Sequence, residues 1–386
     1  MKTSTSKRLR WNVAIWLAAG LFMTGAAGMA SGPILPDPKA EARYQPQVEE
    51  TANGIPLVNI TAPSSGGVSR NEYETFNVPD KGAILNNSYT LSKTELAGYV
   101  PGNNNMAERP AKIIVNEVTG TGFTSMDGFL EVAGNRADVV IANPNGITVN
   151  GGGFINTGRA ILTTGKPIYD DRDNLQNLAV TGGLVDIEGK GLNGKEAGSL
   201  AILSRAVKIN AGIWAKDLHI TTGANTVDAK TLDTAAIGGM YAGRITLVGT
   251  EKGLGVNNSG TWSAEDNLTL DWNGDLKNSG TIYSKGNADL RASRLENDKT
   301  IAAERNLSAA AKENIRNQGK LLAGENMGIY AGKTLDNAGH AMESGNNLSI
   351  ETGDAINNAA GTIKSGGSQQ IKAGHTLTNT EGTLAA

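Results

Sequence analysis

An asparagine recurs about every 20 residues through the C-terminal third of this chain, and this spacing constrains the fold more than any other feature. The column consists of Asn258, Asn278, Asn297, Asn317, Asn337, Asn358 and Asn379. A unit of this length cannot bury its own apolar side chains, so it must stack on its neighbours. The period therefore predicts a solenoid in which each unit forms one coil.

Apolar columns accompany the asparagines in each unit. One column holds Trp262, Ile282, Ile301, Leu321 and Ile363, and another holds Leu276, Leu295, Ile315, Leu335, Ile356 and Leu377. Alternating pairs such as Leu268/Leu270, Met327/Ile329 and Leu348/Ile350 place both side chains on one face of a strand. Each buried Leu or Ile stabilises the stack by roughly 1.5–3 kcal/mol before the ordering entropy is subtracted.

These columns predict an all-β fold, a parallel β-helix with coils of about 20 residues. The recurrent asparagine falls at one corner of every coil. We expect it to accept left-handed backbone angles there and to bond the asparagines above and below in a ladder. Upstream of the repeats, residues 112–118, 137–143 and 159–164 are β-branched runs between turn-forming residues, which also predicts strands.

Composition excludes several functions. The 35 basic and 38 acidic residues give a net charge of −3, which argues against a nucleic-acid partner. Cysteine is absent, so disulfides, thiolate nucleophiles and zinc–sulfur sites are excluded. The histidines, His219, His340 and His375, show no metal-ligand spacing. We therefore expect no cofactor, no metal site and no catalytic residue.

The N-terminus has the pattern of a secretory signal. Basic residues within 2–10 precede an apolar stretch at 11–27, and Gly28 and Ala30 supply the small residues that signal peptidase accepts. The stretch is shorter than the ~20 apolar residues that span a bilayer. We expect residues 1–30 to be a signal peptide cleaved after Ala30, and the proline-rich residues 31–55 to form an extended lead-in.

Several segments resemble successive landmarks of a known family. They are ILNNSYTLSKTELAGYVPGNNN at 84–105, AKIIVNEVTG at 111–120, ANPNGITVNGGGFINTGRAILTTGKP at 142–167, ILSRAVKINAGIWAKDLHITTGAN at 202–225 and GGMYAGRITLVGTEKGLGV at 238–256. The order is that of the secretion domain that opens filamentous haemagglutinin and related exoproteins of bacterial two-partner secretion (TPS). The resemblance implies a TPS secretion domain at 56–256, followed by β-helical haemagglutinin-type repeats at 257–386.

The resemblance also implies a route and partners. The domain would be a right-handed β-helix, exported through the Sec machinery to the periplasm. The POTRA domains of a TpsB-type outer-membrane β-barrel transporter would recognise it there. The protein would be secreted or displayed at the cell surface, where it could meet receptors on host cells or other bacteria.

Two short motifs carry the recognition role in this family. The first falls on Asn143, Pro144, Asn145, Gly146 and Ile147, all intact. The second, usually Asn-Pro-Asn-Leu, falls on Asn103, Asn104, Asn105 and Met106, so it has lost its proline and leucine. Asn-Pro followed by Asn-Gly is also what a tight turn requires, with positive φ at Asn145 and Gly146. The first motif can therefore act through local folding or through contact with the transporter.

Three functions stay open. The haemolysin and contact-toxin branches tend to carry Cys-x-x-Cys after the first motif, where this chain has Val149 and Gly152, so we expect an adhesin of the filamentous haemagglutinin type. The alternatives are the N-terminal part of a contact-dependent inhibition toxin or haemolysin, and a β-helical polysaccharide-degrading enzyme. The array reaches Ala386 within a unit, as expected for the front of a longer fibre or for a shortened gene.

Overall fold

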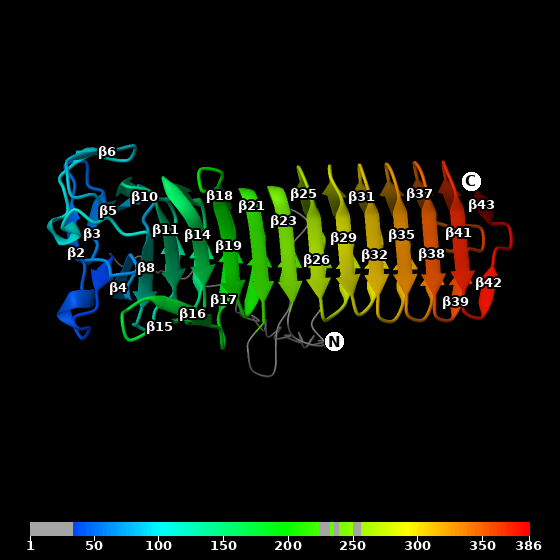
Figure 1. The fold of residues 1–386 in the computed structure, drawn as a ribbon, viewed down its shortest axis with the longest axis horizontal. Helices are drawn as coiled ribbons and strands as arrows, with labels where there is room; N and C mark the ends of the chain where they lie inside the picture. The colour runs from blue at the N-terminus through cyan, green and yellow to red at the C-terminus, as the bar shows by residue number, and fades with distance from the viewer. Residues whose placement is uncertain (1–33, 224–231, 235–238, 250–255) are drawn as a thin grey trace, which may run out of the picture.

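The computed structural model describes residues 34–223, 232–234, 239–249 and 256–386, which form one elongated stack of strands (Figure 1). The expected signal peptide and its cleavage site after Ala30 lie outside these residues. The described part contains two 3-10 turns, η1 (Ala42–Tyr44) and η2 (Asn104–Met106), and no α-helix. Accordingly, none of the described residues form a helix long and apolar enough to cross a membrane.

Each regular coil contributes one strand to each of three faces that run along the stack. Within each face the strands pair in parallel. Face 1 contains β9 (Thr124–Met126), β12 (Ile147–Val149), β17 (Leu184–Ile187), β20 (Ala206–Ile209), β22 (Leu232–Thr234), β24 (Val256–Asn258), β27 (Leu276–Asn278), β30 (Leu295–Asn297), β33 (Ile315–Asn317), β36 (Leu335–Asp336), β39 (Ala355–Asn357) and β42 (Thr376–Thr378). Face 2 contains β3 (Pro56–Asn59), β5 (Ala83–Asn87), β10 (Phe129–Gly134), β13 (Gly152–Ile155), β18 (Leu192–Gly194), β25 (Thr261–Ala264), β28 (Thr281–Ser284), β31 (Thr300–Ala303), β34 (Lys320–Ala323), β37 (Ala341–Ser344), β40 (Thr362–Ser365) and β43 (Thr383–Ala385). Face 3 contains β4 (Val68–Thr75), β8 (Ile113–Val118), β11 (Ala137–Ala142), β14 (Thr157–Thr163), β19 (Ser199–Ser204), β26 (Leu268–Trp272), β29 (Ala288–Ala292), β32 (Leu307–Ala311), β35 (Met327–Ala331), β38 (Leu348–Thr352) and β41 (Gln369–Ala373).

Two long strands, β21 (Gly212–Thr222) and β23 (Gly239–Gly249), run through faces 2 and 3 without a break. For example, β23 pairs with β25 through its first half and with β26 through its second half. Faces 2 and 3 therefore join into one sheet. The prediction of an all-β parallel solenoid is confirmed.

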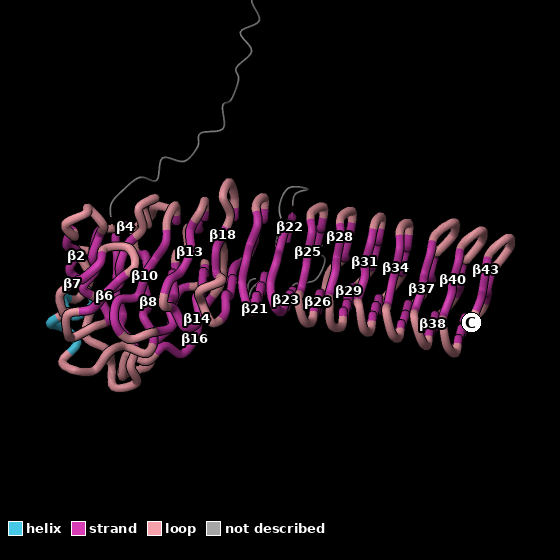
Figure 2. The backbone as a smooth tube through the Cα atoms, turned by 90° about the horizontal axis from the view of Figure 1, so that it is seen from above, coloured by secondary structure: helices cyan, strands magenta, loops and turns pink. Residues whose placement is uncertain are grey.

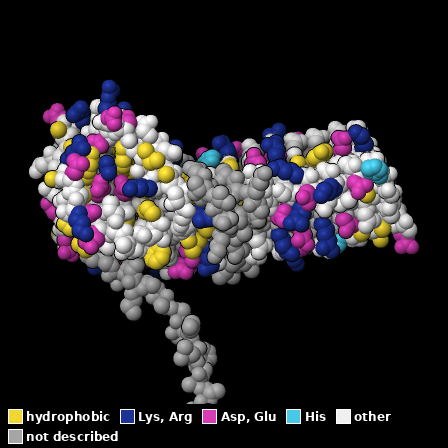
Figure 3. Space-filling model, turned by 90° about the horizontal axis from the view of Figure 1, so that it is seen from below, with side chains coloured by type: hydrophobic (Ala, Val, Ile, Leu, Met, Phe, Trp, Pro, Cys, Tyr) yellow, Lys and Arg dark blue, Asp and Glu magenta, His cyan; other side chains and the backbone are white. Residues whose placement is uncertain are grey.

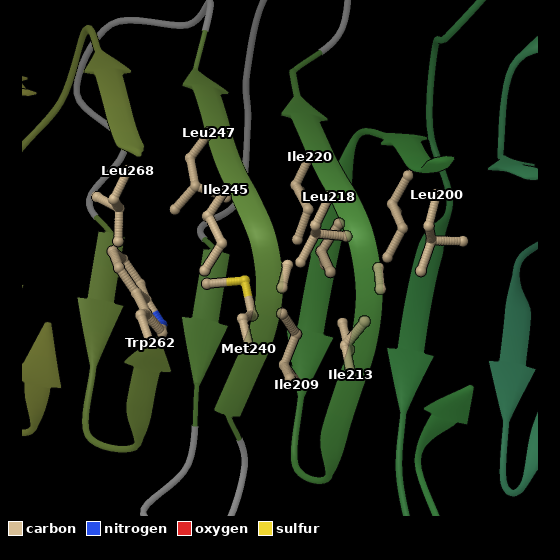
Figure 4. Packing of buried hydrophobic residues seen from close by; sticks show 14 of the residues in the cluster. Leu200, Ile209, Ile213, Leu218, Ile220, Met240, Ile245, Leu247, Trp262 and Leu268 are labelled. Atoms are coloured by element: carbon tan, nitrogen blue, oxygen red, sulfur yellow. The ribbon is translucent and has the colours of Figure 1, made fainter. Parts of the chain in front are cut away.

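The apolar columns form a single continuous core. The column from Trp262 to Ile363 is fully buried, and Met342 fills the slot between Leu321 and Ile363. Figure 4 shows Trp262 and the inward side chains of the preceding coils, from Leu200 to Leu247, stacked between β19 and β26. In the second column, Leu335 is 1% exposed but Leu377 is 44% exposed, so the prediction of a buried column is wrong at this last position.

The predicted asparagine ladder is present at the end of face 1. The Nδ2 of each asparagine from Asn258 to Asn358 donates to the Oδ1 of the next at 2.7–2.8 Å, across 19–21 residues of sequence. These six donors are at most 1% exposed. None of the ladder asparagines has positive φ, so the expected left-handed backbone is wrong. The side-chain amide explains the recurrence, because it satisfies polar groups that the stacked corners bury.

A second ladder follows the corner between faces 2 and 3. Asn306 donates through Nδ2 to the Oδ1 of Asn287 at 2.9 Å, and Asn326 donates to Asn306 at 2.9 Å. Asn347 continues it by donating to Asn326 at 3.2 Å. This ladder runs in the opposite direction to the first, and its members are half-buried at Asn287 and Asn306 and exposed at Asn326 and Asn347. It therefore borders solvent, whereas the first ladder belongs to the core.

The N-terminal end of the stack carries antiparallel strands. In the segment predicted as a lead-in, β1 (Leu35–Pro36) pairs with β4 and β2 (Gln47–Glu50) pairs with β3, both antiparallel. These strands cover the first edges of faces 3 and 2. Unpaired edges invite association with other chains, so this arrangement protects that end of the solenoid.

Two hairpins lie outside the coils at the same end (Figures 1 and 2). The first joins β6 (Ser92–Thr94) and β7 (Gly98–Val100), and the second joins β15 (Lys166–Tyr169) and β16 (Leu175–Ala179). They cover apolar side chains that point outward from faces 2 and 3. Beneath the first lie Ile84 and Ala133, and beneath the second lie Val115 and Val140.

Candidate functional site

The first family motif forms the corner at which β11 of face 3 leads into β12 of face 1. The N–H of Gly146 donates to the carbonyl of Asn143 at 3.1 Å, which closes a four-residue turn. Pro144 occupies the second position of this turn, where its fixed φ is suited. Gly146 has φ +133°, a conformation that other residues rarely adopt. Ile147 is 1% exposed and starts the next core strand.

The amides of Asn143 and Asn145 attach this turn to the preceding coil. The Nδ2 of the fully buried Asn143 donates to the Gly122 carbonyl and the Thr124 hydroxyl, both at 3.0 Å. The Nδ2 of Asn145 donates to the carbonyls of Gly120 and Gly122 at 2.9 and 3.2 Å. Asn145 has no positive φ, so the expectation of a left-handed residue there is wrong. Its side chain provides the structural role instead.

An exposed apolar patch surrounds this turn. It consists of Phe123, which is 59% exposed, Leu184, which is 38% exposed, and the exposed Pro144. A Cβ at Gly146 would lie 2.8 Å from Cδ1 of Phe123 and 3.0 Å from the Leu184 carbonyl oxygen. The glycine therefore allows the Phe123 ring and the Leu184 backbone to approach the turn. Asn143 is buried and the half-buried Asn145 reaches the preceding coil, whereas Pro144, Phe123 and Leu184 are exposed around the turn.

The degenerate second motif builds the same arrangement around η2. The N–H of Met106 donates to the Asn103 carbonyl at 3.1 Å, and Asn103 Nδ2 donates to the carbonyls of Ile60 and Asn86, both at 2.9 Å. Asn105 Nδ2 also donates to the Ile60 carbonyl, at 3.1 Å. Asn103 is 2% exposed and Met106 1% exposed. This turn lies at the corner between faces 2 and 3.

The missing proline does not alter that pattern. Asn104 takes the place of Pro144 and is likewise exposed, so no internal contact depends on its side chain. The side-chain oxygen of the first asparagine accepts from the N–H of the second at 3.0 Å in both turns. The two motifs are therefore structural equivalents despite their different sequences.

Buried acidic groups secure the two hairpins nearby. The carboxylate of Glu131, 3% exposed, accepts from the N–H groups of Glu95 and Leu96 at 2.7 and 2.9 Å, which anchors the β6–β7 hairpin. Burial raises the pKa of Glu131, and the two N–H donors oppose that rise.

The β15–β16 hairpin is held by an arginine. The guanidinium of Arg70 lies 4.2 Å from the ring centroids of both Tyr44 and Tyr169, so it is sandwiched between η1 and the hairpin. Arg70 also pairs with Glu72 at 2.7 Å and lies 3.8 Å from Glu117. Burial raises the pKa of both glutamates, and the charge of Arg70 counteracts the rise. These contacts fix the position of the hairpin against η1 and face 3.

In the described residues, no group of three or more His, Asp or Glu side chains is placed to hold a metal ion.

The capped solenoid, its paired asparagine turns and its docked hairpins define the opening module of a β-solenoid exoprotein. The family model of the TPS secretion domain matches residues 33–283, and that of the haemagglutinin repeat matches 283–339 and 329–381. The chain belongs to the two-partner secretion exoproteins.

Similar proteins agree with this assignment. The chain is 46% identical over 248 residues to the 16S rRNA endonuclease CdiA of Enterobacter cloacae, covering 59% of this chain and 8% of that protein. It is 41% identical over 296 residues to the toxin CdiA of Yersinia pestis, covering 67% and 9%. It is 38% identical over 324 residues to the tRNA nuclease CdiA of Yersinia mollaretii, covering 79% and 11%. The chain thus spans about a tenth of the length of these relatives.

A solved structure supports the fold. The crystal structure of the filamentous hemagglutinin secretion domain aligns with 92% of this chain and 100% of its own, with a TM-score of 0.50 and 24% identity. Membership of the family implies a TpsB-type outer-membrane transporter as partner. The protein is accordingly one that is exported and reaches the cell surface.

Sequence reasoning located both motifs but missed the apolar patch. Phe123 stands in the segment TGTGF, where glycines precede an aromatic residue, and that was an available signal for an exposed ring. Leu184 gave no signal, because it comes next to Phe123 only through the stacking of coils.

Proposed function

We propose that this chain is the N-terminal export module of a long surface protein. The Sec machinery delivers it to the periplasm, and the POTRA domains of its TpsB-type transporter recognise it there. The observation that carries this proposal is the shared amide pattern of the turns at 103–106 and 143–147, both within the secretion domain. The coils then fold one on another outside the cell.

The asparagines and the apolar residues of the first turn have different surroundings. Asn143 and Asn145 donate to backbone carbonyls of the preceding coil, so their side chains support the turn rather than reach a partner. A partner at this corner would meet Phe123, Pro144 and Leu184. We propose that the asparagines act through folding and that the apolar patch makes the contact with the POTRA domains. Apolar and aromatic anchors carry most of the energy of such contacts.

Binding to the purified POTRA domains of the transporter tests this division. We expect Phe123→Ser to weaken binding at least tenfold with an unchanged thermal melt of the full chain. We expect Asn143→Ala to weaken binding too, and in addition to lower the melting temperature of the chain. Tyr330→Ser is the matched control, because Tyr330 is 50% exposed on face 3 of the repeats. Normal binding by Phe123→Ser would refute the contact.

The relatives named CdiA favour one proposal for the whole protein, in which this chain is the N-terminal part of a contact-dependent inhibition toxin. The residues at 149 and 152, which are not cysteines, favour an adhesin that binds receptors on host cells or other bacteria. The gene neighbourhood discriminates these proposals. An immunity gene beside the coding sequence supports the toxin, and its absence supports the adhesin.

We further propose that this part of the chain is not an enzyme and works by noncovalent recognition. Acidic side chains of the repeats are engaged with basic ones, as in the pairs Glu265–Lys285 and Glu325–Arg305. On the face drawn in Figure 3, charged side chains of both signs lie interleaved over these coils. Incubation of the purified chain with a polysaccharide panel tests the proposal, and steady turnover of any member would contradict it.

A further inference from the structure

Two aromatic side chains lie next to each other on the outer side of face 2. Trp214 of β21 is in register with Tyr241 of β23. Their neighbours Ile213 and Met240 point into the core, as Figure 4 shows, so alternation along a strand turns the aromatic residues outward. The ring centroids are 6.2 Å apart, and the planes differ by 15°. Tyr241 is 39% exposed, and Trp214 is partly exposed.

A glycine lets the tryptophan lie flat. A Cβ at Gly212 would come within 2.5, 2.6 and 3.0 Å of three atoms of the six-membered ring of Trp214. The indole therefore covers the Gly212 backbone with one face and turns the other away from the sheet. Gly239 pairs with Gly212 and precedes Tyr241 by the same two residues. The planes are almost parallel, so the two rings on adjacent coils share one orientation.

Charged groups of both signs surround this surface. The Nζ of Lys195 lies 6.0 Å from the indole centroid. At the adjoining corner, Arg244 lies 3.9 Å from Asp217 and 3.8 Å from Asp266. These separations exceed hydrogen-bond length, so the donors and acceptors keep capacity for a ligand. The mixed signs do not favour a strongly anionic ligand.

We propose that Trp214 and Tyr241 form a binding platform for a saccharide chain with flat, β-linked pyranose rings. The C–H face of such a ring can pack on an aromatic face, and its hydroxyls can bond to neighbouring charged groups. Adjacent coils are about 4.8 Å apart, comparable with the advance of one pyranose along an extended chain.

The same outward column suits a ligand that runs along the solenoid. It continues from Tyr241 through Ser263 to Tyr283. The platform lies on a face and on coils separate from the turns at 103–106 and 143–147. Saccharide binding is therefore a further activity, and its loss would leave transporter recognition in place.

Titration calorimetry of the full-length mature chain with cellohexaose and with chitohexaose tests the proposal. We expect at least one of them to bind, and Trp214→Ala to weaken that binding at least tenfold. Binding of cellohexaose indicates a neutral hexose ligand, whereas binding of chitohexaose alone indicates an amino sugar. Each result supports the platform.

Further variants separate the platform from general folding. Gly212→Ala keeps the indole but places a methyl group where the ring lies, so it should also weaken binding, with the thermal melt as a check on folding. Tyr241→Ala offers a second truncation should Trp214→Ala fold poorly. Tyr330→Ala, on face 3, should bind like wild type. The proposal would be overturned if wild type bound neither hexasaccharide, or if folded Trp214→Ala and Tyr241→Ala bound as well as wild type. Tighter binding of a proline-rich peptide than of the hexasaccharides would also overturn it.

Discussion

Asn143 and Asn145 are joined by two hydrogen bonds, because the Oδ1 of Asn143 accepts from the N–H of Asn145 at 3.0 Å and from its Nδ2 at 2.9 Å. The first of these bonds recurs at 3.0 Å between Asn103 and Asn105. In both turns the amides of the pair then reach carbonyls of an earlier segment of chain. The chemistry that the two turns share is thus an asparagine pair that hydrogen-bonds a corner to an earlier segment of chain.

Removing Asn143 should destabilise this corner more than removing Asn145. Asn143→Ala leaves buried polar groups of the preceding corner without partners, at a cost of about 1–3 kcal/mol. Asn145 is only half-buried, and Asn145→Ala should cost about 1 kcal/mol. Urea unfolding followed by circular dichroism measures both, with Tyr330→Ala, at an exposed position of the repeats, as control. Equal stability of wild type and Asn143→Ala would contradict the structural role.

The two asparagine ladders should differ in importance. Asn317→Ala breaks buried bonds to Asn297 and Asn337, so we expect a loss of about 2–4 kcal/mol for two unsatisfied neighbours. Asn326 belongs to the exposed ladder, where water replaces a lost partner, and Asn326→Ala should cost less than about 1 kcal/mol. Thermal melts of the two variants provide the comparison. A larger effect at Asn326 would refute the distinction.

The buried leucine column should reject charge according to depth. Leu335→Asp places a carboxylate in a position that is 1% exposed and should unfold the neighbouring coils. Leu377→Asp changes the same column where it is 44% exposed and should be tolerated. Limited proteolysis with circular dichroism reads out both variants. An unchanged melt of Leu335→Asp would remove the column argument.

Docking of the β6–β7 hairpin should weaken as pH rises. Burial raises the pKa of Glu131 above its ordinary 4.5, so the folded state binds the proton more tightly than the unfolded state. The contribution to stability is then fully present below 4.5 and is lost as pH rises through the folded pKa. Hydrogen exchange at the Glu95 and Leu96 amides, corrected for intrinsic rates, follows the docking. Glu131→Gln should flatten the dependence, whereas docking that tightens with rising pH would contradict the account.

The sequence was sufficient to predict the repeat architecture because each coil repeats its side-chain pattern. The columns through Ile301 and Leu335 are buried as their period required. The second ladder was not predicted, although Asn287, Asn306 and Asn326 recur with the same period. Periodicity indicated where asparagines stack but not their φ, which depends on how each corner closes.

The hairpins and the apolar patch could not be read from local patterns. The hairpin that contains the strand at 166–169 is held by Arg70, almost a hundred residues earlier, through a stacking contact with Tyr169. Phe123 and Leu184 both approach Gly146 only because their coils stack on either side of it. The second motif looked degenerate because it lacks the proline and the leucine, although Asn103 and Asn105 repeat the hydrogen-bond pattern of the first motif.

Secretion with and without the transporter tests the central claim most directly. The experiment compares three strains. The first expresses the full chain alone, the second expresses it together with the TpsB-type transporter encoded beside it, and the third expresses Asn145→Ala with that transporter. The account predicts wild-type protein in the medium only when the transporter is present, and a larger periplasmic fraction for Asn145→Ala. Wild-type protein in the medium without the transporter, or retained in the periplasm with it, would contradict the claim.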